Sequence, residues 1–184
     1  MSEKMYHCEP CNKYYTHKRS LDRHVKDKHI QHEITESQPE AEVEKYIKAF
    51  VYQFLDFWGC NLEQFPLYLP ECIQILIKET RAVHNIQHET FRTMSIVLTK
   101  YYSSDENVLL QLVDEMFKDE IFNWGRIIHL FTMAIELSEH TNKHNLPDIY
   151  YEIPDMLVYA LKKADDWIRN QGGWSAFAVM YNKL

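Results

Sequence analysis

Glycine is scarce in this chain of 184 residues, which holds four glycines, six prolines and four cysteines. Strict apolar–polar alternation, the pattern of a half-buried strand, is also missing beyond the first few residues. Both absences favour an all-α body. Long apolar runs are missing as well, because the best one, residues 127–137, contains His129 and Glu136 and falls short of the roughly 18–20 residues of a membrane span. We expect neither a membrane span nor a signal peptide.

The sequence also shows no combination of residues that is typical of a catalytic site. Cys60 and Cys72 show no nucleophile-and-base arrangement, and no glycine-rich phosphate loop occurs. Acidic residues within helical patterns are interpreted as solvated faces. Five histidines lack a convincing ligand spacing and are interpreted as surface or partly packed residues: His84, His88, His129, His140 and His144. The chain is therefore not expected to be an enzyme.

The net charge of −7 is unevenly distributed. Residues 1–30 carry seven Lys and Arg against four Asp and Glu, which gives +3 there and −10 in the remainder. An acidic body repels nucleic acid and attracts basic partners. The 46% hydrophobic content predicts a folded core, and the length allows one domain of about 140 residues plus a small one. Unpaired thiols and one pair at zinc spacing indicate a reducing compartment inside the cell.

Residues 1–30 contain the spacing of a zinc finger. Cys8 and Cys11 are separated by two residues and His24 and His29 by four, so two thiolates on a tight hairpin and two imidazoles on a helix can converge on one tetrahedral zinc ion. Three further residues fit the small core of such a unit: Tyr6, Tyr15 and Leu21. The segment therefore looks like a ββα Cys-Cys-His-His finger. Scattered surface residues are the alternative, and His32 is a less suitable substitute for His29.

The role of this finger is left open by the sequence. In fingers that read DNA, three helix side chains contact successive bases, and here they would be His17, Ser20 and Arg23. One finger covers only about three base pairs, and the segment is modestly basic, so it would bind DNA weakly. We favour a protein-contact or structural role.

Helical patterns begin after a polar linker at residues 31–41 and continue through a predicted domain at 42–184. Apolar residues at spacings of three and four mark each helix. Pro154 either kinks a helix or lies in its first turn, and Gly172 and Gly173 precede a last short helix. The patterned segments are 43–58, 73–83, 91–98, 105–117, 124–137, 146–168 and 174–181.

The segment that organises this domain is Asn123-Trp124-Gly125-Arg126 with the apolar run behind it. Apolar residues cover most of the circumference of residues 124–137, which predicts a central helix buried on nearly all sides. An arginine near the positive end of a helix dipole requires a carboxylate. We expect an acid from another protein to meet Arg126, and an internal pair with Asp119 or Glu120 is the alternative.

These four residues resemble the first homology motif of the B-cell-lymphoma-2 (Bcl) family of apoptosis regulators. A second block, residues 166–177 (Asp-Trp-Ile-Arg-Asn-Gln-Gly-Gly-Trp-Ser-Ala-Phe), resembles the second homology motif of that family and stands in the family's order and at about its usual separation. The resemblance implies a Bcl-type helical bundle around a central hydrophobic helix. Most family members continue into a membrane anchor, which is not expected after Leu184.

The family's third homology motif, the death helix, is degraded here. That motif needs a leucine followed five residues later by aspartate, but Leu76 is followed by Arg81, and no aspartate occurs between Asp56 and Asp105. Killers in the family use their own death helix to engage partners. The missing acid therefore indicates a pro-survival protein. If the anchor is absent as we expect, the combination is similar to viral members of the family.

The resemblance, closest to the myeloid-cell-leukaemia branch, also implies a hydrophobic groove that binds the death helix of pro-apoptotic partners. Leu109 and Phe117 are expected in the core instead. Asn123 would bond beside the partner's aspartate on Arg126, and glycine at 125 would let the partner's backbone approach. The groove residues implied are Val83, Phe91, Met94, Leu98, Leu112, Val113 and Met116.

Other functions and locations remain open. The competing interpretation is a nuclear regulator whose finger contacts DNA while the helical domain dimerises or recruits partners. A pore-forming killer is disfavoured by the missing aspartate and by the expected absence of an anchor. We expect a cytoplasmic location with recruitment to mitochondria by partners, and a homodimer with an occluded groove is left open.

Overall fold

The computed structural model describes residues 6–8, 13–15, 40–59, 69–102 and 107–182. The chain divides into two compact units, residues 1–43 and residues 44–184. The first unit contains a two-stranded antiparallel hairpin made of β1 (Tyr6–Cys8) and β2 (Lys13–Tyr15). Tyr6 pairs with Tyr15, and Cys8 pairs with Lys13.

This hairpin lies where the zinc-finger interpretation places one. Cys8 is the last residue of β1. The other proposed ligands, Cys11, His24 and His29, lie outside the described residues, and so does the predicted finger helix. The zinc site therefore stays a prediction.

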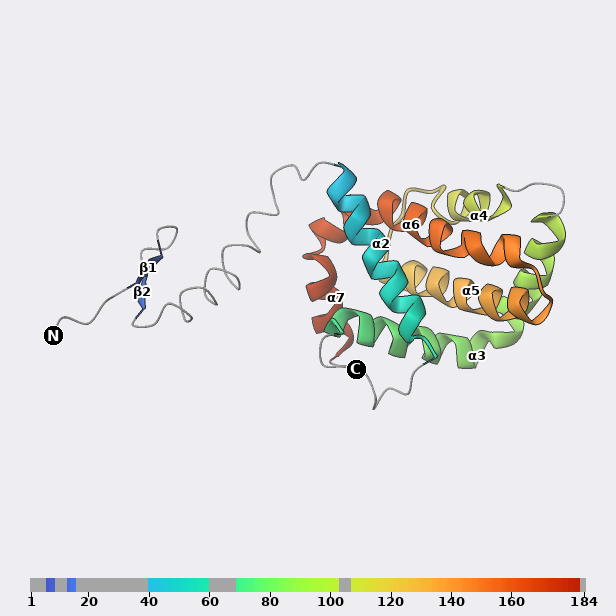
Figure 1. Ribbon diagram of the computed structural model, residues 1–184, viewed down its shortest axis with the longest axis horizontal. Coiled ribbons are helices and arrows are strands. Elements are labelled where there is room, and N and C mark those ends of the chain that lie inside the picture. Colours follow the sequence, from blue (N-terminus) through green and yellow to red (C-terminus); the bar gives the residue numbers. More distant parts are fainter. Residues whose placement is uncertain (1–5, 9–12, 16–39, 60–68, 103–106, 183–184) are drawn as a thin grey trace. The chain divides into compact units, whose positions relative to one another are not determined.

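The second unit is helical, which confirms the predicted all-α body (Figure 1). α5 contacts both α3 and α6, while α4 and α7 each contact α3 and α6. Among the helices of the described residues, none is long and apolar enough to cross a bilayer. The helices are α2 (Glu40–Phe57), α3 (Glu71–Tyr102), α4 (Val108–Met116), α5 (Trp124–Lys143), α6 (Pro147–Asn170) and α7 (Gly173–Tyr181).

α5 is the buried central helix that the apolar pattern predicts. Every residue from Leu130 to Leu137 is buried, so this stretch has no solvent-facing side. Phe131 is fully buried, and its ring lies 6.4 Å from that of Phe50 and 4.5 Å from that of Phe54, both on α2. The chain thus builds its core by surrounding one helix with the apolar faces of the others.

The helices around α5 bury the faces that their spacing predicts. On α2 the buried residues are Ile47, Phe50, Val51 and Phe54. Leu109 and Phe117 are 1% and 5% exposed, which confirms their expected place in the core. The stripes at 73–83 and 91–98 lie on one continuous helix of 32 residues, α3.

Pro154 lies inside α6, whose first turn contains Pro147 instead. The helix therefore begins seven residues before Pro154, which resolves the two alternatives left by the sequence. Gly172, which precedes α7, and Gly173, its first residue, have φ angles of +90° and +70°. A side chain at Gly172 would be strained in this left-handed conformation, and its Cβ would lie 3.0 Å from that of Ala176.

The two homology blocks meet in space through their aromatic rings. Trp124, at the start of α5, lies 4.9 Å from the Trp167 ring, 5.4 Å from the Trp174 ring and 5.0 Å from the Phe177 ring. Aromatic pairs at such separations stabilise a core beyond the area that they bury. This cluster therefore fixes the start of α5, and with it Arg126, against α6 and α7.

Candidate functional site

The start of α5 is shaped by two residues of the first homology block. Asn123 has an extended backbone and occupies the N-cap position, where its Oδ1 accepts a hydrogen bond from the backbone N–H of Arg126 at 2.8 Å. A Cβ on Gly125 would lie 3.2 Å from that same Oδ1. Asn123 therefore caps α5, and Gly125 leaves room for that cap. Both residues have a structural role within α5 itself.

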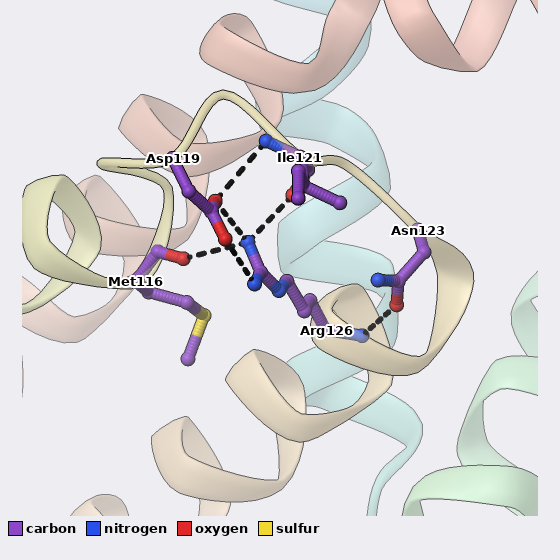
Figure 2. A network of polar contacts seen from close by, with 5 residues as sticks. All are labelled: Met116, Asp119, Ile121, Asn123 and Arg126. Carbon is purple, nitrogen blue, oxygen red and sulfur yellow. Dashed lines mark hydrogen bonds and ion pairs between the residues drawn. The ribbon is translucent and has the colours of Figure 1, made fainter.

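Arg126 is held by the loop between α4 and α5 (Figure 2). Its Nη1 and Nη2 donate to the two carboxylate oxygens of Asp119 at 2.5 and 2.6 Å. Nη1 also lies 2.7 Å from the carbonyl oxygen of Ile121 and 3.2 Å from that of Met116. Asp119 in turn accepts a hydrogen bond from the backbone N–H of Ile121 at 3.1 Å. The guanidinium thus ties the end of α4, the loop and the start of α5 together.

The structure shows Arg126 in the internal pair with Asp119, which is the alternative that the sequence left open, and an acid from another protein at Arg126 stays a prediction. Asp119 is close enough because the loop folds back over the first turn of α5. The pair remains open to solvent, since the side chains of Arg126 and Asp119 are 31% and 45% exposed. Water, or a carboxylate from another molecule, can reach the guanidinium.

The electrostatics follow this geometry. Hydrogen bonds from Arg126, and secondarily from the backbone N–H of Ile121, lower the pKa of Asp119 from 3.8 to about 2. The same carboxylate raises the pKa of Arg126 above its ordinary value. The site is thus a charged, bidentate pair throughout the neutral range.

This pair predicts a pH dependence of stability. The pKa of Asp119 is lower in the folded chain, so its contribution is complete above about pH 4 and is lost as the pH falls towards 2. We expect the stability difference between the wild type and Asp119→Asn to shrink over that range. Urea denaturation of both proteins at several pH values measures it, and a constant difference would contradict the pair.

The predicted groove residues lie on α3 and α4, two helices that contact each other. Two of them are core residues, since Phe91 is 4% exposed and Val113 is fully buried. Phe91 packs against the ring of His129 on α5. The other five are partly exposed, as a binding surface requires: Val83, Met94, Leu98, Leu112 and Met116. Their role in partner binding stays a prediction.

The structure also brings together residues that sequence reasoning set aside. Glu136 lies within α5 and is 4% exposed, so its interpretation as part of a solvated face is wrong. Its carboxylate lies against His84 and His88 of α3, two histidines that were assigned no ligand spacing. The signal was present: two histidines four residues apart share one face of a helix, and a lone acid interrupts an apolar run.

Comparison with known proteins places the chain in a family. A family model described as "Apoptosis regulator proteins, Bcl-2 family" matches residues 76–174. Apoptosis regulator R11 of Xenopus laevis is 25% identical over 114 residues, which cover 61% of this chain and 55% of that relative. Apoptosis regulator Bcl-2 of Gallus gallus is 32% identical over 71 residues, 38% of this chain and 30% of the relative. The matched parts span about half or less of these relatives.

Solved structures share the fold. The zebra-fish pro-survival protein NRZ superposes with a TM-score of 0.64 alone and 0.63 in its complex with the Bad BH3 segment. The identities are 16% and 15%, and the match covers 77% of this chain and 94% and 95% of those chains. The similarity establishes a Bcl-2-like helical fold. Because the family model spans more than half of the chain, the protein belongs to the Bcl-2 family of apoptosis regulators, which are regulatory proteins and not enzymes.

Proposed function

We propose that this protein is a pro-survival regulator that sequesters the death helix of pro-apoptotic partners between α3 and α4. The observation that carries the proposal is the geometry of Arg126, which holds a carboxylate bidentately at a partly exposed position and contacts the carbonyl oxygen of Met116, one of the partly exposed groove residues. A site that accepts Asp119 in this way has the shape and charge to accept an aspartate from a partner helix.

The degraded death helix favours a receptor over a killer. Its apolar residues Ile73, Leu76 and Ile77 are fully buried in the chain's own core. Arg81, at the position of the missing acid, donates to the carbonyl oxygen of Trp58 and lies 5.4 Å from the centre of that indole ring. The segment is thus occupied in the protein's own packing, which supports a protein that receives a death helix and does not offer one.

In this mechanism the partner's amphipathic helix lays its apolar anchors on the partly exposed groove residues. Met94 and Met116 suit such a surface because methionine adapts to several ligands. The partner's aspartate takes the place of Asp119 on Arg126, and the loop moves aside to release it. Asn123 contributes by capping α5, and glycine at 125 leaves its oxygen in place.

A fluorescence titration of the full chain with a panel of labelled death-helix peptides tests this function. We expect saturable binding by several peptides, and no binding by a scrambled peptide of the same composition. The chain is not expected to release dye from liposomes, since that is the property of the pore-forming killers. Failure of every peptide to bind would remove the pro-survival function.

The N-terminal unit is proposed to hold one zinc ion through Cys8, Cys11, His24 and His29. The β1–β2 hairpin supports this, because it carries Cys8 on a strand of the kind that such a finger uses. The role proposed for this zinc finger is contact with other proteins.

The location proposed for the chain is the cytoplasm, with recruitment to mitochondria by partners. The branch of the family proposed as most similar to it is the myeloid-cell-leukaemia branch.

A further inference from the structure

Two histidines and one glutamate converge where α3 packs on α5. His84 Nε2 lies 2.9 Å from the Oε2 atom of Glu136, and His88 Nε2 lies 3.6 Å from the same oxygen. The candidate ligand atoms of the three residues all lie within 4.8 Å of one another. This cluster lies entirely within the helical domain.

The separations suit a small tetrahedral cation. Zinc bonds of about 2.0–2.2 Å to nitrogen and oxygen place neighbouring ligand atoms about 3.3–3.6 Å apart. The His88–Glu136 distance already lies at that value, and the His84–Glu136 contact needs to lengthen by only about 0.5 Å. The two distances to Glu136 therefore need little change, while the ligand atoms of His84 and His88, which lie within 4.8 Å, have to approach each other by side-chain rotation.

The burial of the Glu136 carboxylate favours the binding of a cation. The Glu136 side chain is 6% exposed and lies in the stretch of α5 from Leu130 to Leu137 whose residues are all buried, where an ionised carboxylate is costly without a compensating positive charge. The His84 side chain is 15% exposed and its ring packs edge-on against Trp58, which shields one side of the cluster from water. A divalent ion here would neutralise the carboxylate that the apolar surroundings disfavour.

The site is also open to solvent on one side. The His88 side chain is 43% exposed, so an ion can enter from solvent, and water can complete the coordination. The other ring nitrogen of His88, Nδ1, lies 3.7 Å from a carboxylate oxygen of Glu89. At that distance the two groups form no hydrogen bond, so Glu89 only adds negative charge near the site.

We propose that His84, His88 and Glu136 form a zinc-binding site that ties α3 to α5. Two imidazoles and one carboxylate with an open fourth position are a ligand set that zinc uses in proteins. The bound ion joins α3 to the central helix, so zinc stabilises the helical domain. The site does not depend on the finger or on the binding of a death helix.

Equilibrium dialysis against zinc tests the proposal in the full chain carrying Cys8→Ser and Cys11→Ser, which removes the thiolates of the finger. We expect one zinc ion per chain. Adding His88→Ala should weaken binding by about 100-fold or more, because loss of an outer partner alone costs 10–100-fold and His88 is a direct ligand. Glu136→Gln, which keeps the size of the side chain, should act in the same direction.

His144→Ala is the matched control. His144 also stands four residues from another histidine, His140, and their rings lie 4.4 Å apart, but they are not part of the carboxylate cluster. Zinc affinity should be unchanged in this variant.

Thermal melting gives a second measurement, since zinc should raise the melting temperature of the parent and leave that of His88→Ala unchanged. Absence of zinc binding by the parent, or equal binding by His88→Ala, would overturn the site. His88 is partly exposed, so this variant should fold even if Glu136→Gln does not.

Discussion

Phe131→Ala is expected to lower the free energy of unfolding by about 3–5 kcal/mol. Phe131 is fully buried in α5, and its ring contacts those of Phe50 and Phe54 from α2. Truncation removes a large apolar side chain from the core and leaves a cavity between two helices that can collapse only in part. Chemical denaturation with urea, followed by far-ultraviolet circular dichroism, measures the change.

Tyr151→Ala is a suitable comparison. Tyr151 is also an aromatic residue on a helix, but it is 74% exposed, so its removal should change stability by no more than about 0.5 kcal/mol. A loss for Phe131→Ala as small as that for Tyr151→Ala would mean that α5 is not the centre of the core.

The central helix could be predicted because a run of apolar residues that are close together in the sequence indicates its burial. Apolar side chains cover most of the circumference of residues 127–137, so a fold of this chain has to shield nearly all sides of this helix from water. The same holds for α2, where Ile47, Phe50 and Phe54 form one stripe at helical spacing. Such patterns are local, so they do not require knowledge of the tertiary contacts.

The pairing of Arg126 could not be settled in that way. Asp119 and Glu120 are adjacent in sequence, and both were candidates for an internal acid. The choice depends on the path of the loop, which brings Asp119 and the carbonyl of Ile121 over the same guanidinium. The contacts of Glu136 have a similar origin, because they depend on how α3 and α5 are aligned across their interface. Sequence spacing on one helix carries no information about that alignment.

Arg126→Ala is expected to weaken the binding of a death-helix peptide by about tenfold or more. The Asp119–Arg126 pair is exposed in the free protein, and solvent weakens it. A bound helix would cover the guanidinium, so the new pair with the partner's aspartate should be stronger than the one that it replaces. Without Arg126 the partner's aspartate would be covered without a counter-charge and would lie near Asp119, whose charge repels it. A fluorescence titration with wild type and variant measures the loss, and equal affinities would exclude Arg126 from the site.

Asp119→Asn should act in the opposite direction, because it removes the internal competitor and leaves the arginine in place. Exposed ion pairs contribute little, so the gain in affinity should be about two- to fivefold. A peptide with its aspartate replaced by alanine should bind the wild type more weakly, yet lose little further on Arg126→Ala, since the two changes remove the same contact. If Asp119→Asn weakens the peptide instead, Asp119 assists Arg126 in the complex and does not leave it. This one variant therefore distinguishes an arginine that exchanges one acid for another from an arginine whose partner is fixed.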